Sequence, residues 1–293
     1  MRFTSSLGCA VTMLAWAPPR VCLAETNLEE LAKAPAGKRL NYGSDPLQFG
    51  ELTLPNGPGP YPVVINIHGG CWLAEYNIDH SRALANALAK DGIAVWNLEY
   101  RRVGDPGGGW PGTFLDVGKG ADHLRELAKE HPLDLSRVVV MGHSAGGHFA
   151  LWLAGRKKVP DKSEIRSDNP IAVSGVLALA PAPELDALHT KGVCGNVVDK
   201  LMGGAPGDLP DRYRAAMPSF MSPIGVRQTI LIGSRDADWR WVGEAYVEKA
   251  RAAGDKQIEI VMAPEAGHSE VIDPNSNTWP VVLGSVRALL GSK

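Results

Sequence analysis

The chain has 293 residues, of which 44% are apolar, and this size and composition are typical of one globular domain with a large core. Its 30 basic and 32 acidic side chains nearly balance, and the sequence has neither a basic stripe nor an acidic tail. Charge therefore indicates no nucleic-acid partner. Beyond the first two dozen residues, no apolar stretch approaches the 18 residues of a membrane span, so none is expected there.

Residues 1–24 differ from the rest and resemble a secretory signal peptide. Arg2 precedes an apolar stretch, and the small residues Cys22 and Ala24 stand three positions and one position before a potential cleavage site. This pattern predicts a mature domain of residues 25–293 and a periplasmic or secreted protein. If the segment is instead a frayed tail, or if translation starts later, the protein would be cytoplasmic.

Strand-like apolar runs alternate with helical patterns along the rest of the chain. The strand-like runs cover residues 47–55, 61–70, 93–101, 137–142, 171–181, 227–234 and 256–264. Helical spacing of apolar residues occurs at 81–92, 112–131, after residue 144 and at 278–290. Strands separated by helices predict an α/β fold, with a mostly parallel central sheet and helices on both faces.

Residues 182–226, called the insertion below, interrupt this alternation with a segment that has no clear strand. An insertion this long between two core strands is typical of a functional cap. Six of its apolar side chains are too many for a solvated loop and need a surface to cover; they are Leu185, Leu188, Leu201, Met202, Phe220 and Met221.

The motif Gly142-His143-Ser144-Ala145-Gly146 stands where a buried strand-like run ends and a helical pattern begins. Glycines let a strand reverse into a helix without a Cβ clash, so the Ser144 hydroxyl would project at the helix N-terminus. Parallel sheets bind ligands beyond the carboxyl ends of their strands, which is where Ser144 lies. This context favours a nucleophilic serine over a purely structural glycine-rich turn.

The stretch HGGCW, residues 68–72, follows an earlier strand-like run and offers a loop with free backbone N–H groups. A nucleophilic serine needs donors for the oxyanion that forms when it attacks a carbonyl group. We expect the N–H groups of Gly70, Cys71 and Ala145 to form this oxyanion hole, with His68 bracing the loop.

The HGGCW and GHSAGG motifs, in this order, resemble those of the α/β-hydrolase fold, particularly its esterase and lipase branch. The H-G-G-x-W form is similar to that of the kynurenine formamidase group and its bacterial esterase relatives. The resemblance covers nearly all of the chain after the predicted signal peptide. It implies a serine hydrolase with a Ser-His-acid triad and a cap inserted before the strand that carries the acid.

The resemblance also implies that the acid and the histidine follow the serine in that order. In relatives the acid lies three positions past the glycine that ends its strand, which from Gly233 leads to Asp236. Asp238 is the competing candidate, and is otherwise expected as the N-cap of a helix before Trp239. Of the eight histidines, His268 alone stands in a loop at a strand end downstream of the acid, which predicts that it is the base.

Five side chains are candidates for substrate contacts. Trp72, His143 and Trp239 are close in sequence to the predicted catalytic elements. Phe220 and Met221 belong to the insertion, which we expect to pack at the mouth of the pocket and to set the size of the accepted group.

Cleavage of the signal peptide would leave two cysteines, Cys71 and Cys194. In an exported protein they permit one disulfide, but two buried thiols are an equal alternative.

We expect hydrolysis of carboxylic esters of small or aryl substrates through an acyl-enzyme. Arylformamidase activity is the alternative, because formamides react through the same kind of intermediate; the predicted export disfavours it, since tryptophan breakdown is cytosolic. A non-catalytic binding protein on a hydrolase fold is disfavoured because serine, acid and histidine are all present. The sequence has no H-E-x-x-H or C-x-x-C metal motif, and its glycine-rich residues 104–110 match neither a P-loop nor a dinucleotide fingerprint, so no cofactor is expected.

Overall fold

The computed structural model describes residues 26–291, so the predicted signal peptide lies outside the described residues. In this range the strands form one sheet in the order β1-β2-β4-β3-β5-β6-β7-β8. Six neighbouring strands pair in parallel, namely β4, β3, β5, β6, β7 and β8. At one edge of the sheet, β1 and β2 are antiparallel to their neighbours. The predicted mostly parallel sheet is confirmed. The strands are β1 (Lys38–Asn41), β2 (Phe49–Thr53), β3 (Tyr61–Ile67), β4 (Ala94–Leu98), β5 (Leu133–His143), β6 (Gly175–Leu179), β7 (Arg227–Gly233) and β8 (Ile258–Ala263).

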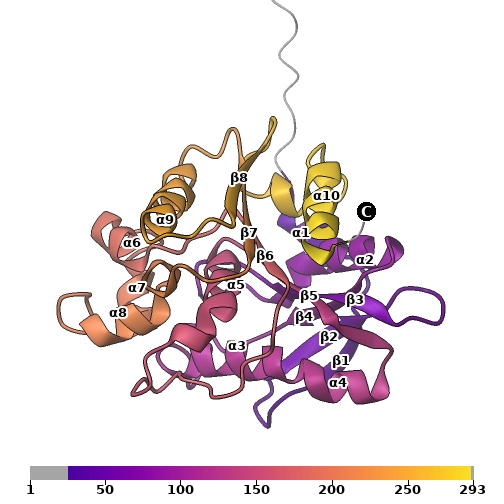
Figure 1. The fold of residues 1–293 in the computed structure, drawn as a ribbon, viewed down its shortest axis with the longest axis horizontal. Helices are drawn as coiled ribbons and strands as arrows, with labels where there is room; N and C mark the ends of the chain where they lie inside the picture. Colours follow the sequence, from indigo (N-terminus) through magenta and orange to yellow (C-terminus); the bar gives the residue numbers. More distant parts are fainter. Residues whose placement is uncertain (1–25, 292–293) are drawn as a thin grey trace, which may run out of the picture.

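Helices cover both faces of the sheet (Figure 1). One face packs against α1 (Leu28–Ala32), α2 (Arg82–Lys90) and α10 (Trp279–Leu290). The other face packs against α3 (Gly112–Asp122), α4 (Leu124–Glu130), α5 (Ala145–Gly155) and α9 (Arg240–Ala252). The sheet therefore separates two hydrophobic cores, as expected for helices on both faces.

The central strands contain long apolar runs because they serve both cores. In β3, Val63 and Ile65 face the core beneath α5, whereas Val64 faces the core beneath α2 and α10. Successive side chains of a strand point to opposite faces, so a strand that is buried on both sides has a continuous apolar sequence instead of an alternating one. This is why β3 and β5 stand out in the sequence.

The segment 112–131 forms two helices, although its spacing predicts one. In a continuous helix the Gly120 carbonyl would accept a hydrogen bond from the Leu124 N–H. Here it accepts a hydrogen bond of 2.8 Å from the indole N–H of Trp96, and the helix is interrupted at His123. A side chain that inserts into a helical hydrogen-bond ladder is a recognised cause of such breaks.

The insertion contains α6 (Leu185–Lys191), α7 (Val197–Met202), α8 (Pro210–Ala216) and a 3₁₀ turn at Pro218–Met221, η3. Five of the six apolar side chains singled out in the insertion are fully buried in the same core as α5, and the sixth, Phe220, is 58% exposed. The insertion is thus a layer of the main core on the α5 side of the sheet (Figure 1). Across residues 26–291, no helix combines the length and the apolar character that crossing a membrane requires.

Candidate active site

Ser144 occupies a sharp turn between β5 and α5. Its backbone has φ 54° and ψ −117°, a conformation that costs free energy for any residue with a Cβ. The turn is so tight that a Cβ added at Gly146 would lie 2.1 Å from the carbonyl oxygen of Ile67. The nucleophile-like serine is therefore held at the N-terminus of α5, where the helix dipole favours negative charge.

His268 and Asp236 follow the two neighbouring strands β8 and β7 and contact each other. The Nδ1 atom of His268 lies 2.8 Å from an Oδ2 atom of Asp236, which is 4% exposed. A proton on Nδ1 donates to this carboxylate and leaves Nε2 free to accept a proton. Asp238 is exposed and makes no such contact; the helix N-cap is Trp239, so the N-cap expectation for Asp238 is wrong by one residue.

Two aromatic side chains flank the His268 ring. Trp239 stacks on it, with ring centroids 5.0 Å apart and an angle of 24° between the planes. On another side, His143 donates a hydrogen bond of 2.8 Å from Nε2 to the backbone carbonyl of His268. Burial, and next the nearby His268, hold the pKa of His143 well below its ordinary value of 6.5. His143 is therefore a neutral ring that anchors the His268 loop.

The loop of residues 68–72 passes beside Ser144. A Cβ added at Gly69 would lie 3.2 Å from the Ser144 Cβ. In the described part of the chain, the N–H groups of Gly70 and Cys71 have no backbone acceptor. The N–H of Ala145, the first residue of α5, has no intrahelical acceptor either. These three groups are thus available to a bound oxyanion.

A buried polar cluster supports this loop from behind. Nε2 of His68 lies 2.9 Å from Oε1 of Glu99, and the Tyr100 hydroxyl donates a hydrogen bond of 2.9 Å to the His68 carbonyl. Burial opposes ionisation of Glu99, but the adjacent His68 and Arg102 outweigh it and hold the pKa of Glu99 below its ordinary value. The expected bracing role of His68 thus has a charged partner that the sequence motif did not identify.

Three predicted substrate contacts do not line the cavity at Ser144, so these expectations are wrong. The Trp72 side chain is 1% exposed and points into the core, where its indole N–H lies 3.3 Å from Nδ1 of His148. Phe220 projects into solvent beside Arg214, and Met221 is buried against α5. Met221 is buried because the insertion uses most of its apolar side chains to complete the main core, whereas Phe220 points outward and Trp72 points inward.

The cavity at Ser144 has a volume of about 270 Å³. Six predicted site residues line it: Gly70, Cys71, His143, Ser144, Trp239 and His268. Four other residues that were not predicted also line it, and these are Leu28, Tyr76, His80 and Ser269. Tyr76 and Ser269 are close in sequence to the predicted motifs, so the sequence could have identified them. Nothing in the sequence indicates that Leu28 of α1 lies at this cavity. None of the insertion residues lines it.

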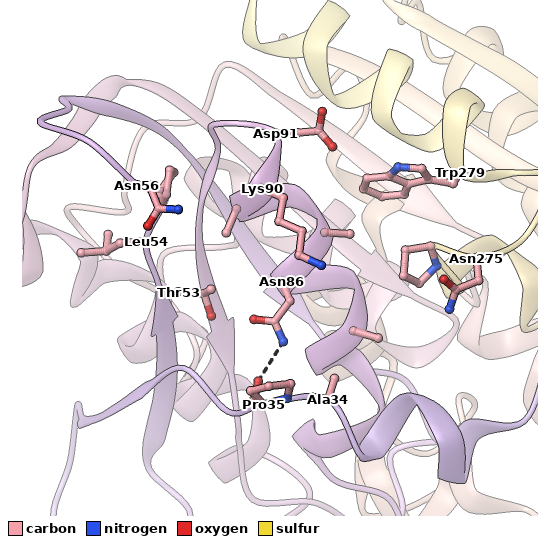
Figure 2. A pocket seen from close by; sticks show the side chains of 15 residues that line it. Ala34, Pro35, Thr53, Leu54, Asn56, Asn86, Lys90, Asp91, Asn275 and Trp279 are labelled. Atoms are coloured by element: carbon pink, nitrogen blue, oxygen red, sulfur yellow. Dashed lines mark hydrogen bonds between the residues drawn. The ribbon is translucent and has the colours of Figure 1, made fainter.

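A larger hollow of about 570 Å³ lies elsewhere, between α2 and the start of α10. Figure 2 shows Asn86 and Lys90 on one side of it and Trp279 on the other. It contains none of the predicted site residues, so size alone does not identify the candidate site. Residues 26–291 contain no group of three or more His, Cys, Asp or Glu side chains arranged to hold a metal ion.

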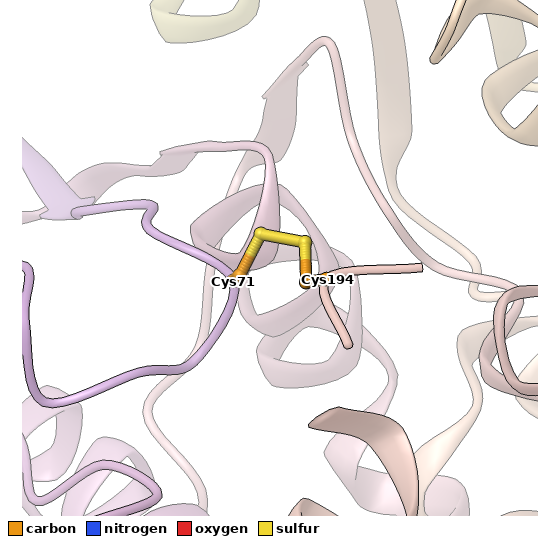
Figure 3. Close-up of a disulfide and its surroundings, with 2 residues drawn as sticks. All are labelled: Cys71 and Cys194. Carbon is orange, nitrogen blue, oxygen red and sulfur yellow. A yellow bond between two sulfur atoms is a disulfide. The ribbon is translucent and has the colours of Figure 1, made fainter. Parts of the chain in front are cut away.

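Cys71 and Cys194 form a disulfide, with the two Sγ atoms 2.00 Å apart (Figure 3). Of the two alternatives left open by the sequence, the structure contains the bonded one. The bond joins the loop of residues 68–72 to the connection between α6 and α7, and it is the direct covalent contact of the insertion with the cavity wall.

Comparison with characterised proteins gives esterases and thioesterases. The chain is similar to esterase LipC of Mycobacterium tuberculosis, with 26% identity over 263 residues that cover 83% of this chain and 62% of LipC. It is also 27% identical to human acyl-coenzyme A thioesterase 1 over 257 residues, and this alignment covers 83% of this chain and 56% of the thioesterase. The chain thus spans about three fifths of the length of these two relatives.

Solved structures show the same fold. Esterase B of Lactobacillus rhamnosis, inhibited by a tributyrin phosphonate, superposes with a TM-score of 0.75 at 21% identity, covering 90% of this chain and 91% of that one. A truncated carbohydrate esterase from gut microbiota gives a TM-score of 0.72 at 18% identity, covering 90% and 99%. At these identities the likeness establishes the fold, which is that of the α/β-hydrolases.

The sequence matches the BD-FAE family over residues 51–237, nearly two thirds of the chain. The matched range includes Gly70, Cys71, Ser144 and Asp236, and it ends before His268. The chain therefore belongs to the BD-FAE family of α/β-hydrolase-fold esterases.

Proposed function

We propose that the protein hydrolyses carboxylic esters through an acyl-enzyme formed on Ser144. One observation carries the proposal: Ser144, in its strained turn, and His268, paired with the buried Asp236, open into the same small cavity. A serine, a histidine with its Nε2 free and a carboxylate on Nδ1 are the three groups that this reaction needs. The esterase names of relatives such as LipC support the same activity.

In the proposed reaction, Oγ of Ser144 attacks the ester carbonyl carbon while Nε2 of His268 takes the hydroxyl proton. The N–H groups of Gly70, Cys71 and Ala145 stabilise the oxyanion, aided by the dipole of α5. The bond to the alkoxy oxygen then breaks, and the alcohol leaves with the proton held by His268. Water attacks the acyl-enzyme in the same way, which releases the acid and restores the serine hydroxyl.

The cavity supports a small substrate. Its volume of about 270 Å³ equals roughly nine water molecules at the ~30 Å³ that each occupies in the liquid. Leu28, Tyr76 and Trp239 give it apolar and aromatic walls. We therefore propose short acyl groups or single aromatic rings as the groups bound next to Ser144.

Kinetics on p-nitrophenyl esters of increasing acyl length, beside N-formylkynurenine, test the proposal. Ser144→Ala and His268→Ala should each lower kcat by about 10³-fold or more while circular dichroism shows an intact fold. Near-normal turnover by Ser144→Ala, in a preparation free of other esterases, would refute the role of this serine. Preference for N-formylkynurenine over every ester would replace the proposed substrate class with a formamide.

Asp236→Asn and Asp238→Asn form a matched pair, since both remove one carboxylate from the same loop. Asp236→Asn should lower kcat by about 10³-fold or more, because an amide opposite Nδ1 favours the wrong tautomer of His268. Asp238→Asn should stay within about twofold of wild type, since its side chain is exposed and contacts none of these groups. Equal losses in the two variants would remove Asp236 from the triad.

We also propose that the protein is exported and that residues 1–24 are removed. The disulfide between Cys71 and Cys194 supports this, because disulfides persist in oxidising compartments. Expression of the full chain in a bacterium, followed by intact-mass measurement of the periplasmic fraction, should give a protein that starts at Glu25. Full-length protein confined to the cytoplasm would contradict export.

A further inference from the structure

We propose that Cys194 is a positioning residue for the oxyanion hole. Through the disulfide it holds Cys71, so that the Cys71 N–H stays directed at the oxyanion, and turnover falls when the bond is opened. The inference rests on the proposed function, because it assigns a task to a residue of the insertion that does not itself touch the substrate.

The backbone around Cys71 needs an external support. Gly70, Cys71 and Trp72 have φ values of 110°, 51° and 57°, so three consecutive residues adopt left-handed or similar conformations. For residues with a Cβ, this region is sterically unfavourable. Released from its contacts, Cys71 would relax to a negative φ, and its N–H would turn to a new direction.

Other contacts hold the two ends of this loop, and at its centre the Gly70 carbonyl accepts a hydrogen bond of 2.9 Å from the Leu73 N–H, so the disulfide adds to this turn the covalent support of the Cys71 side chain. His68 is tied to Glu99 at one end, and the Trp72 indole is tied to His148 at the other. His148 in turn lies 2.9 Å from the Ala216 carbonyl, which belongs to the insertion. Between these ends, Cys71 has a backbone N–H without a protein acceptor in the described chain and a side chain whose bond is to Cys194.

The partner end of the disulfide is firmly anchored. Cys194 lies between α6 and α7, whose inward side chains Leu188, Val197 and Leu201 are at most 1% exposed. The N–H of Val193 donates a hydrogen bond to the Leu188 carbonyl, so the residue before Cys194 is fixed to α6. The disulfide therefore ties a strained loop to a partly exposed connection whose two flanking helices are packed in the core, and through them it can position Cys71.

Opening the bond follows ordinary thiol–disulfide exchange. A dithiol such as dithiothreitol supplies two electrons and two protons, which leave Cys71 and Cys194 as free thiols and the reductant as a cyclic disulfide. Cys71 lines the cavity, so a small reductant has access to this side of the bond. The Michaelis complex needs no oxyanion donor, whereas the transition state does, so kcat and not KM should respond.

The test compares the wild-type full chain, Cys194→Ala and the neighbouring control Val193→Ala, each with and without dithiothreitol, on p-nitrophenyl acetate. Peptide mapping first verifies the link between Cys71 and Cys194 in the untreated protein. Reduced wild type and Cys194→Ala should both lose at least about 10-fold in kcat, with KM within about twofold. Cys194→Ala should be indifferent to reductant, and Val193→Ala should keep wild-type kcat until it is reduced.

Retention of kcat within twofold by reduced wild type or by Cys194→Ala, below their melting temperatures, would overturn the proposal. So would a rise in KM at constant kcat, since the disulfide would then only shape the cavity wall. Amide hydrogen exchange provides a readout that is independent of esterase activity. Reduction should speed exchange of the Leu73 N–H, which is hydrogen-bonded to the Gly70 carbonyl, by about 10-fold or more and leave residues 142–147 unchanged. Equal exchange in both states would overturn the inference even if the proposed function itself failed.

Discussion

His143 lies between the serine and the histidine of the candidate site and serves both by position. It precedes Ser144 in the turn, and its Nε2–H holds the carbonyl of His268 at 2.8 Å. The two rings are 4.7 Å apart. The sequence suggests His143 only as a substrate contact, yet here it joins the turn to the loop that carries the proposed base.

We predict that His143→Ala lowers kcat by about 10- to 100-fold with little change in KM, because the loop that carries His268 loses its anchor. His143→Gln should recover most of the loss, since the Gln side-chain amide can donate the same hydrogen bond. Steady-state kinetics of the two variants provide the test. Equal activity of His143→Ala and wild type would show that the His268 loop needs no such anchor.

The same histidine makes a prediction about pH. Burial and the nearby His268 hold its pKa well below 6.5, so His143 stays neutral in the pH range in which an ordinary histidine titrates. The acidic limb of the profile of kcat/KM against pH must then come from another group. His143→Gln should leave the midpoint of that limb within about 0.3 pH units of wild type. A shift of a full unit would show that His143 titrates in this range.

At this scale, the sequence predicts the residues whose role is set by neighbours in the chain. Ser144 is predicted from its own turn and His268 from its place after a strand, whereas the choice of Asp236 is what the family resemblance implies. Trp72 is wrongly predicted as a substrate contact because its side-chain direction depends on His148, a residue from another element. Directions of side chains that depend on distant partners are not encoded locally.

Among the elements, the turn from β5 to α5 is the most constrained. A Cβ at Gly146 would meet the carbonyl oxygens of Ile67 at 2.1 Å and His68 at 2.6 Å, and these belong to backbone that cannot move aside without shifting the loop at residues 68–72. Gly146→Ala should therefore lower the free energy of unfolding by about 1–3 kcal/mol and reduce kcat as well. Urea denaturation and kinetics measure the two effects.

Gly284→Ala in α10 is the matched control for that substitution. A Cβ at Gly284 would have no atom within 4 Å, and the residue is exposed within a helix. Alanine is the better helix former, so this variant should raise the free energy of unfolding by about 0.5–1 kcal/mol and leave kcat unchanged. If both glycine variants were destabilised alike, the close approach at Gly146 would not be the cause.

Elements that are buried on both faces were predictable, and those defined by a single partner were not. β3 and β5 have continuous apolar runs because each serves two cores. The break at His123 depends on one hydrogen bond from Trp96, and the short elements β1 and α1 carry too few residues for a periodic pattern. The placement of the insertion on the core side of α5 follows from packing that only the folded chain reveals.

For the molecule as a whole, buried histidines limit stability in acid. Burial, and for His80 the adjacent His68 as well, lowers the pKa of His80 to about 3, and burial lowers that of His148 to about 4. Their ordinary value, which the unfolded chain recovers, is 6.5. Because the folded values are depressed, the unfolded state binds more protons below pH 6.5, and stability falls as the pH drops from there toward the folded values.

His148→Gln tests this linkage. When the pH falls from 7 to 5, His148 alone should lower the free energy of unfolding of the wild type by about 2 kcal/mol. A glutamine at this position does not titrate and so makes no such contribution. Urea denaturation at both pH values should therefore show a smaller loss for His148→Gln than for wild type, even if the variant is less stable at pH 7. Identical losses would mean that His148 is protonated in the folded protein.

The disulfide also fixes how the chain is connected in space. Its two cysteines are 123 positions apart in sequence, and the ring of backbone that they close contains Ser144 but neither Asp236 nor His268. A protease that cuts once inside this ring, for example after the exposed Lys162, cannot release either part. The nicked protein would run as one species until it is reduced, and the serine would stay bound to the half that carries its proposed acid and base.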